Sequence, residues 1–178
     1  METEPNVMQQ TIESQRLILR PFTLTDAERV ANLLSDQRIS DMTANIPYPY
    51  RVSDAHNWIQ RHSNMFLSGT GIVYAIVLKQ TMEVIGTVSF PKIENGVGVL
   101  GYWLGVPFWG HGYATEASSL LISYMKEHRG LTQLQVTHLA DNARSRSVIN
   151  KLGVTYKGNQ INHMQGKERE VCVYLSTL

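Results

Sequence analysis

Residues 101–130, GYWLGVPFWGHGYATEASSLLISYMKEHRG, contain a strand, a glycine-bearing loop and a helix in immediate succession. The segment Tyr102–Val106 has the aromatic and branched side chains typical of a strand, and Pro107 ends it because proline has no amide for a sheet ladder. The sequence predicts that the helix begins between Gly112 and Thr115 and ends at Gly130. Its apolar residues recur at helical spacing at Ala117, Leu120, Leu121, Tyr124 and Met125.

The loop between this strand and helix, residues 109–114 (WGHGYA), carries almost no side-chain bulk at its two glycines and its alanine. Its backbone amides, with the positive end of the following helix dipole, suit it to hold a phosphate or pyrophosphate. A tight turn that needs glycine only for its backbone angles is the alternative, and glycine spacing alone favours that turn. The patterns of a Walker loop and of a dinucleotide-binding loop are both absent.

Length and composition predict one domain spanning residues 1–178, with residues 1–10 as a flexible extension. Sixteen basic and fifteen acidic residues, without a basic block, argue against a nucleic-acid partner. The acidic start of the chain is unlike a secretory signal, and the longest apolar run, Ile72–Leu78, is too short to cross a membrane. We therefore expect a cytoplasmic protein with no membrane partner, either a monomer or a homodimer.

The remaining chain predicts a mixed, mostly antiparallel sheet of about seven strands with about four helices. Before the central segment we expect a strand at Arg16–Pro21, then a helix opened by a Thr25–Glu28 capping box and a second helix capped by Ser53. A hairpin of Gly71–Lys79 with Val84–Phe90 should follow, and then a turn at Asn95–Gly96. After it we expect a strand at Gln133–Leu139, a helix at Asn142–Leu152, and strands near Val154–Gln160 and Glu170–Leu175.

Three segments resemble the GNAT superfamily of N-acetyltransferases. In WGHGYATEA, Gly112 and Ala114 match the last fixed positions of that superfamily's acyl-coenzyme A pyrophosphate loop, although Trp109 stands where Arg or Gln is usual. Ser14–Asp26 resembles the opening of its ribosomal-protein N-terminal acetyltransferase branch. Asn142, Ser145 and the later Lys-Leu-Gly match a third motif. The resemblance implies an α/β (α+β) single-domain GNAT fold, splayed between its fourth and fifth strands.

The same resemblance implies acetyl-CoA as co-substrate and assigns residues to it. Asn142 would contact the pantetheine arm, while Ser145 would lie near the sulfur and donate a proton to the departing thiolate. Tyr48 and Tyr50, in a proline-punctuated loop, would border the groove of the acceptor amine. The coenzyme-binding residues implied are Leu104, Gly105, Val106, Trp109, Gly110, His111, Gly112, Tyr113, Ala114, Thr115, Asn142 and Ser145.

The sequence does not single out a general base. Val99 occupies the place where related enzymes often carry a Glu, and His163 is the candidate near a second such place, because an unperturbed imidazole titrates near pH 6.5. Position alone does not rank Glu94, Glu168 and Glu170, and His111 and His138 are expected to shape the coenzyme region. No metal site is expected, because the six histidines are scattered without metal-ligand spacing.

A weak base favours an acceptor of low pKa. Presenting a neutral amine at pH 7 costs about 1.4 kcal/mol for an α-amine but about 4.6 kcal/mol for a lysine. We therefore expect direct transfer to an α-amine of a protein or peptide N-terminus. The alternatives are a small-molecule amine such as a polyamine, an antibiotic or an amino acid, and a non-catalytic acyl-CoA-binding sensor.

Overall fold

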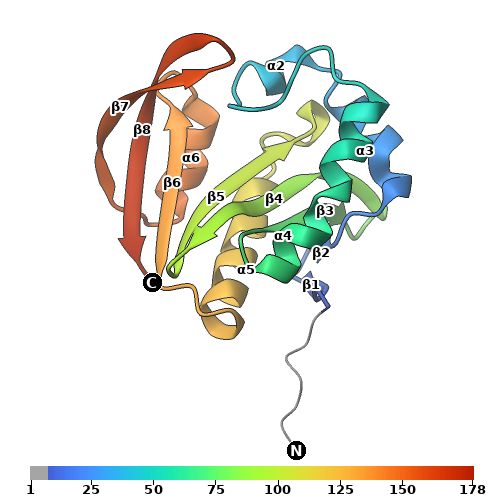
Figure 1. Cartoon of the computed structure of the whole chain (residues 1–178), viewed down its shortest axis with the longest axis horizontal. Helices are drawn as coiled ribbons and strands as arrows, with labels where there is room; N and C mark the ends of the chain where they lie inside the picture. The colour runs from blue at the N-terminus through green and yellow to red at the C-terminus, as the bar shows by residue number, and fades with distance from the viewer. Residues whose placement is uncertain (1–7) are drawn as a thin grey trace, which may run out of the picture.

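The computed structural model describes residues 8–178, which form one eight-stranded sheet in the order β1-β2-β3-β4-β5-β6-β8-β7 (Figure 1). All neighbouring strands are antiparallel except β5 and β6, which are parallel. The strands are β1 (Ile12–Glu13), β2 (Leu17–Arg20), β3 (Ile72–Leu78), β4 (Glu83–Glu94), β5 (Val97–Leu104), β6 (Gln133–Leu139), β7 (Tyr156–Met164) and β8 (Lys167–Thr177). The helices are η1 (Leu24–Asp26), α1 (Ala27–Leu33), α2 (Gln37–Ser40), α3 (Val52–Gln60), α4 (His62–Ser68), η2 (Val106–Phe108), α5 (Tyr113–His128) and α6 (Ala143–Lys151).

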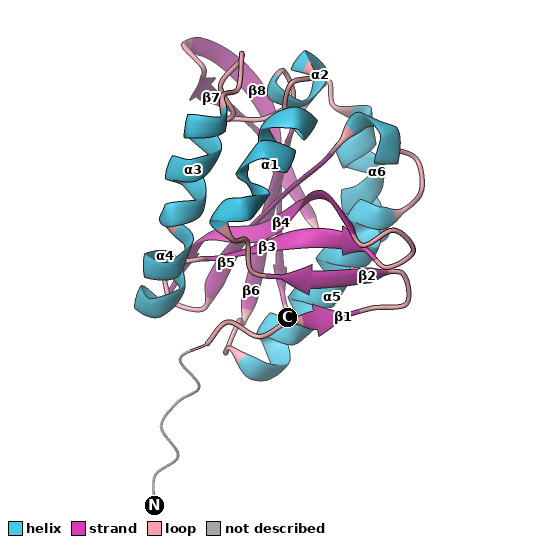
Figure 2. Ribbon diagram, turned by 90° about the vertical axis from the view of Figure 1, so that its right-hand side faces the viewer, coloured by secondary structure: helices cyan, strands magenta, loops and turns pink. Residues whose placement is uncertain are grey.

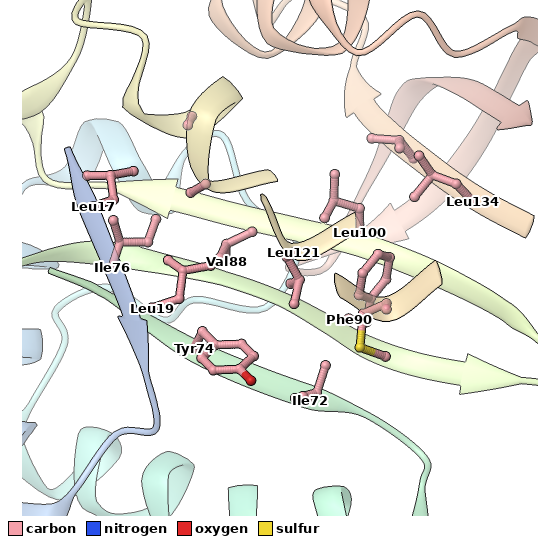
Figure 3. Close-up of a cluster of buried hydrophobic side chains, with 14 of the residues drawn as sticks. Leu17, Leu19, Ile72, Tyr74, Ile76, Val88, Phe90, Leu100, Leu121 and Leu134 are labelled. Carbon is pink, nitrogen blue, oxygen red and sulfur yellow. The ribbon is translucent and has the colours of Figure 1, made fainter. Parts of the chain in front are cut away.

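Strand β3 lies between the two halves of the hydrophobic core. All of its residues are buried, and they alternate between the two faces of the sheet as the period of a strand requires. Ile72, Tyr74, Ile76 and Leu78 pack in the cluster beneath α5, whereas Val73, Ala75 and Val77 pack in the cluster beneath α1 and α3. Figure 2 shows α1 and α3 on one side of the sheet and α5 and α6 on the other. Figure 3 shows Leu121 of α5 among the side chains of the sheet.

The sheet splays between β5 and β6, the fourth and fifth strands of the sequence-based prediction. Val97–Leu100 pair with Gln133–Val136, and the pairing ends there. Beyond this seam Gly101–Leu104 pair only with β4, and Thr137–Leu139 pair only with β8. The predicted splay is confirmed, and it opens the sheet immediately before the glycine loop.

The predicted hairpin of β3 and β4 and the turn at Asn95–Gly96 are also confirmed, the two turn residues having φ of 52° and 77°. The predicted strand and helix numbers are close to those observed. The structure adds the short β1, forms the separate α2, and divides the second predicted helix into α3 and α4. Strand β5 ends at Leu104 rather than Val106, because Val106–Phe108 turn into η2.

The two helix caps predicted before the central segment are wrong. Asp26, not Glu28, closes the first helical turn, because its carboxylate accepts from the Thr23 amide at 2.8 Å and pairs with Arg20 at 2.8 Å. The second helix begins after Arg51, whose amide donates to Asp54 at 2.8 Å, so Ser53 lies inside the helix.

Of the predicted N-terminal extension, residues 1–7 lie outside the described part of the chain. The Gln9 amide group donates to the Val73 carbonyl at 2.7 Å, and the Gln10 carbonyl accepts from the Tyr74 hydroxyl at 2.5 Å. These two residues are therefore attached to β3.

Candidate active site

A cavity of about 1130 Å³ lies at the splay of the sheet. Its wall is built from α2 and the loop after it, α3, the middle of β4 and the end of β5, the glycine loop, the end of β6 and α6. Segments that are far apart in the sequence thus line one cavity.

The glycine loop enters α5 through left-handed backbone. Gly110 has φ of 81°, and Gly112, which precedes the first residue of the helix, has φ of 79°. A side chain at such a φ is strained, so glycine is required here for conformation. Gly110, Gly112, Tyr113, Ala114 and Thr115 line the cavity, which places the start of the 16-residue helix α5 against it. The helix dipole and the free amides of a first turn favour an anion at this position.

Glu116, in the first turn of α5, holds this loop against the first strands. Its carboxylate accepts from the Ser14 hydroxyl at 2.6 Å and from Nε of Arg16 at 2.7 Å. Arg16 also donates to the His111 carbonyl at 2.9 Å, and its guanidinium lies 4.6 Å from the centre of the Tyr113 ring. Burial raises the pKa of Glu116, but the hydrogen bonds from Ser14 and Arg16 outweigh it and leave the pKa below its usual value. The Ser14–Arg16 segment therefore helps to fix the position of the glycine loop.

Ser145 and Tyr102 meet across the splay. The Tyr102 hydroxyl lies 2.6 Å from Oγ of Ser145, and the Ser145 amide donates to Oδ1 of Asn142 at 3.1 Å. Asn142 therefore caps α6, and this cap holds Ser145 in place. Burial raises the pKa of Tyr102 to about 12, so its phenol stays protonated and can donate to Oγ of Ser145. The hydroxyl proton of Ser145 is then free to serve another acceptor.

Two arginine side chains lie against the ring of Trp109 at the rim of the cavity. Its indole Nε1 donates to the Leu104 carbonyl at 3.0 Å. The guanidinium of Arg144 lies 3.4 Å from the centre of its ring, and that of Arg38 lies 5.8 Å away. Burial, followed by the charge of Arg38, lowers the pKa of Arg144. The sequence reasoning assigned Trp109 to the coenzyme loop but gave no sign of either arginine.

Another part of the cavity wall contains Tyr50 and Asp54. Asp54 is the only carboxylate among the wall residues that the structure describes. Burial, followed by the charge of Asp54, raises the pKa of Tyr50 to about 12. Tyr48 is 51% exposed and lies outside the wall, so the structure separates the two tyrosines predicted to act together.

The turn between β7 and β8 meets the loop that follows α2. Nε2 of Gln165 lies 3.1 Å from the Ser40 carbonyl, 3.3 Å from that of Thr43 and 3.0 Å from that of Ile46. Met164, next to this turn, lines the cavity together with residues 42–47. The C-terminal hairpin and the acceptor-side loop therefore form adjoining parts of one wall (Figure 1).

Several predicted site residues lie elsewhere. His163 is exposed outside the wall, with Nε2 3.6 Å from Glu168, and Glu94, Glu168 and Glu170 are also outside it. Gly105, Val106 and His111 do not line the cavity. The Gly105 amide donates to the Ile85 carbonyl at 2.8 Å.

His138 lines the cavity but is held by two contacts. Its Nδ1 lies 2.7 Å from the Leu139 carbonyl, and its Nε2 lies 3.1 Å from the Tyr174 hydroxyl. A neutral ring that donates from Nδ1 and accepts at Nε2 satisfies both contacts. This arrangement agrees with a role in shaping the cavity.

Asp54 and Tyr102 are two further wall residues that sequence reasoning missed. Asp54 directly follows Ser53, and no motif in the sequence around it indicates a site. Tyr102 carried a usable signal, because it lies on the same face of β5 as the buried Leu100 and Leu104 by strand alternation.

Within residues 8–178, no group of three His, Cys, Asp or Glu side chains is arranged to hold a metal ion. Over the same range, the helices are all too short or too polar to cross a membrane.

Comparisons with known proteins agree with this geometry. Residues 16–155 match the family model described as "Acetyltransferase (GNAT) domain". The Bacillus licheniformis protein named "Uncharacterized N-acetyltransferase p20" is 32% identical over 171 residues, covering 95% of this chain and 96% of its own. The ribosomal-protein-serine acetyltransferase of Escherichia coli is 28% identical over 97 residues, covering 53% of this chain and 54% of its own. Among solved structures, the microcin C7 self-immunity acetyltransferase MccE, in complex with acetyl-CoA and AMP, superposes with a TM-score of 0.84 at 22% identity, covering 93% and 94% of the two chains.

Proposed function

Since this chain belongs to the family of acetyltransferase (GNAT) domains, we propose that it transfers the acetyl group of acetyl-CoA to the α-amine of a protein or peptide N-terminus. One observation carries the proposal: the glycine loop, Ser145 and Asp54 all line the same cavity. A site for a phosphate-bearing donor, a proton donor and a carboxylate for a cationic acceptor therefore occur in one space.

The wall residues fit acetyl-CoA. The left-handed Gly110 and Gly112 expose the backbone of the loop, and the start of α5 favours an anion such as a diphosphate. Asn142 lines the cavity beside Ser145, where its side-chain amide can serve the amide-rich arm of the coenzyme. A volume of about 1130 Å³ leaves room for an acceptor beside the thioester.

Ser145 and Tyr102 supply the proton for the leaving thiol. In direct transfer the amine nitrogen forms a bond to the acetyl carbon, and the bond from that carbon to sulfur breaks. Ser145 would donate its hydroxyl proton to the sulfur and receive the proton of Tyr102 in turn, across the 2.6 Å that separate the two oxygens. The amine nitrogen gives up its extra proton to solvent, and a proton from solvent restores the phenol of Tyr102, whose pKa is raised to about 12 by burial.

The acceptor side favours an amine that is readily neutral at pH 7. Asp54, a partly buried carboxylate of the cavity wall, can bind the ammonium form of the acceptor and orient it. An α-amine needs the least help, because its pKa is near 8. The E. coli relative, named as a ribosomal-protein-serine acetyltransferase, supports a protein as acceptor.

A small-molecule amine is the second candidate. The contact of Gln165 with the loop after α2 narrows the space on the acceptor side, and this arrangement also suits a compact acceptor. The aromatic side chains of Tyr50 and Trp58 in the same wall would contact its apolar part.

The test is thiol release from acetyl-CoA with a panel of acceptors: peptides beginning with Ala, Ser or Met, polyamines, aminoglycosides and free amino acids. We expect release with peptides and its loss when the α-amine is blocked. Turnover confined to small amines would select the second candidate. Saturable acetyl-CoA binding without acceptor-dependent release throughout the panel would favour a non-catalytic sensor.

A further inference from the structure

Arg38, Trp109 and Arg144 form a cluster that we call the arginine–tryptophan cluster. Its members come from α2, the loop before α5 and the first turn of α6. The indole is fixed by its hydrogen bond to the Leu104 carbonyl at 3.0 Å. Arg144 lies at 3.4 Å and Arg38 at 5.8 Å from the centre of its ring, so two guanidinium groups share one aromatic side chain.

The two arginines differ in their charge balance. Arg38 is paired with Asp36, whose carboxylate accepts from it at 2.6 Å and 2.9 Å. Arg144 forms no ion pair within residues 8–178, and its recorded contacts are the Trp109 ring and the repulsive charge of Arg38. The cavity wall as described holds four cations, Arg38, Arg61, Arg144 and Lys151, against the single carboxylate of Asp54. Arg144 is therefore a positioned cation without a counter-charge.

The cluster adjoins the acceptor part of the cavity. Trp109 packs against both hydrophobic clusters, and the one beneath α1 and α3 also receives Ile46, Tyr50 and Trp58 of the proposed acceptor side. Arg38 lies next to Ile39 in the same wall, and Arg144 directly precedes Ser145. The glycine loop and the start of α5 already provide for the diphosphate of the coenzyme.

We propose that the arginine–tryptophan cluster binds an oxyanion, a carboxylate or a phosphate, carried by the acceptor close to its reactive amine. Trp109 holds the flat face of the Arg144 guanidinium, and the edge of the guanidinium donates hydrogen bonds to the anion. The inference rests on the proposed function and narrows it: the preferred acceptor carries an acidic group as well as an amine. For a peptide, this predicts Asp or Glu soon after the N-terminal residue.

The test compares matched peptides, Ser-Asp-Ala-Ala and Ser-Asn-Ala-Ala, each with an amidated C-terminus. Their binding to the coenzyme A-saturated protein is measured by isothermal titration, which needs no turnover. We expect the acidic peptide to bind about tenfold more tightly, the gain typical of a charge-assisted hydrogen bond. Arg144→Gln should abolish the preference. Arg129→Gln, which removes an arginine that lies 4.7 Å from the centre of the Phe66 ring outside the cavity wall, should retain it.

Two further outcomes separate the possible sources of the anion. Trp109→Leu should weaken the preference for the acidic peptide. The double variant with Arg144→Gln should lose little more, because both changes remove the same anion-binding site. Equal binding of the two peptides, or no binding of either, would overturn the inference. A loss of acetyl-CoA affinity in Arg144→Gln, with the peptide preference intact, would assign the arginine to the coenzyme instead. Selective peptide binding without thiol release would contradict the proposed reaction while leaving the anion subsite supported.

Discussion

The Tyr102 hydroxyl of β5 lies 2.6 Å from Oγ of Ser145 in α6, so the gap in the sheet is crossed by a pair of hydroxyl groups. Ser145 is only 8% exposed, and burial keeps the phenol protonated at neutral pH. A buried hydroxyl that accepts a hydrogen bond from a phenol is a better proton donor at its own hydrogen, because hydrogen bonds in a chain polarise one another.

The first prediction concerns this pair. Ser145→Ala should lower turnover by about 10- to 100-fold, because water can partly replace a general acid. Tyr102→Phe should lower it less, and the double variant should be little worse than Ser145→Ala, since the hydroxyls act in sequence. Turnover is measured by thiol release where chemistry limits the rate, with acetyl-CoA affinity as the control. Additive losses would show that the two residues act independently.

The second prediction concerns Asp54. Asp54→Asn should raise the KM for the amine about 10- to 100-fold, the range expected for losing a hydrogen bond to a charged group, and should leave acetyl-CoA affinity unchanged. The asparagine oxygen can still accept from the Arg51 amide, so the start of α3 should remain intact. Glu94→Gln is the matched control, because Glu94 lies outside the cavity wall. An unchanged acceptor KM in Asp54→Asn would remove the carboxylate from the acceptor site.

The third prediction distinguishes two effects of replacing a glycine: the strain of a left-handed backbone, and the loss of a position that contacts the ligand. Gly112 and Gly130 have φ of 79° and 72°, so alanine at either should cost about 1–2 kcal/mol of folding stability. A Cβ at Gly112 would meet the Arg16 guanidinium at an ordinary 3.5 Å, and one at Gly130 would meet nothing within 4 Å. Only Gly112→Ala should weaken acetyl-CoA binding, by about tenfold if the loop relaxes away from its strained backbone. Equal affinities of the two variants would indicate a simple turn.

The fourth prediction concerns the stability of the protein in acid. His62 is 6% exposed between Phe22 and Trp58, and neither ring nitrogen has a hydrogen-bond partner among the described residues. Burial, followed by the charge of Arg61, lowers the pKa of His62 to about 4. An unfolded histidine has a pKa near 6.5, so the unfolded state binds more protons between these values, and stability falls as the pH drops from about 6.5 to about 4.

This loss should amount to about 3 kcal/mol at pH 4, given 1.36 kcal/mol for each unit of pKa difference. It is measured as the free energy of unfolding in denaturant at pH 7.5 and pH 4.5. His62→Phe, which keeps an aromatic ring in the cluster, should show a smaller difference between the two pH values. The same difference in both proteins would mean that carboxylates such as Asp26 and Glu116 account for the acid sensitivity.

Local patterns predicted the elements that depend on nearby residues. The hairpin of β3 and β4, the turn at Asn95–Gly96 and the helix that follows Asn142 each depend on residues close in sequence, and all three are present. The Thr25–Glu28 capping box failed because Arg20, on the preceding strand, draws Asp26 into an ion pair that fixes the turn earlier. A long-range contact there decided between two similar local patterns.

The parts of the site that were missed depend on tertiary contacts. Tyr102 and Ser145 are separated by 43 positions, and only the crossing of the splay brings them together. The sequence around Arg144 shows only a helix start, and the importance of this residue follows from its contact with the Trp109 ring. The family resemblance indicates the glycine loop because that loop is continuous in sequence, whereas the proposed acceptor side is assembled from separate segments.

The short pairing between β5 and β6 separates two parts of the molecule in space, and it should also separate them in cooperative unfolding. Four residue pairs join β6, and with it β8 and β7, to the rest of the sheet. Residues 131–178 should therefore open as a unit of their own, with backbone amides that exchange with solvent faster than those of β3 and β4. A ligand that contacts both Gly112 and Asn142 would tie this unit to the larger one. Amide exchange should then slow in both parts of the sheet together. The bound substrate would link the two parts where β5 and β6 are not paired.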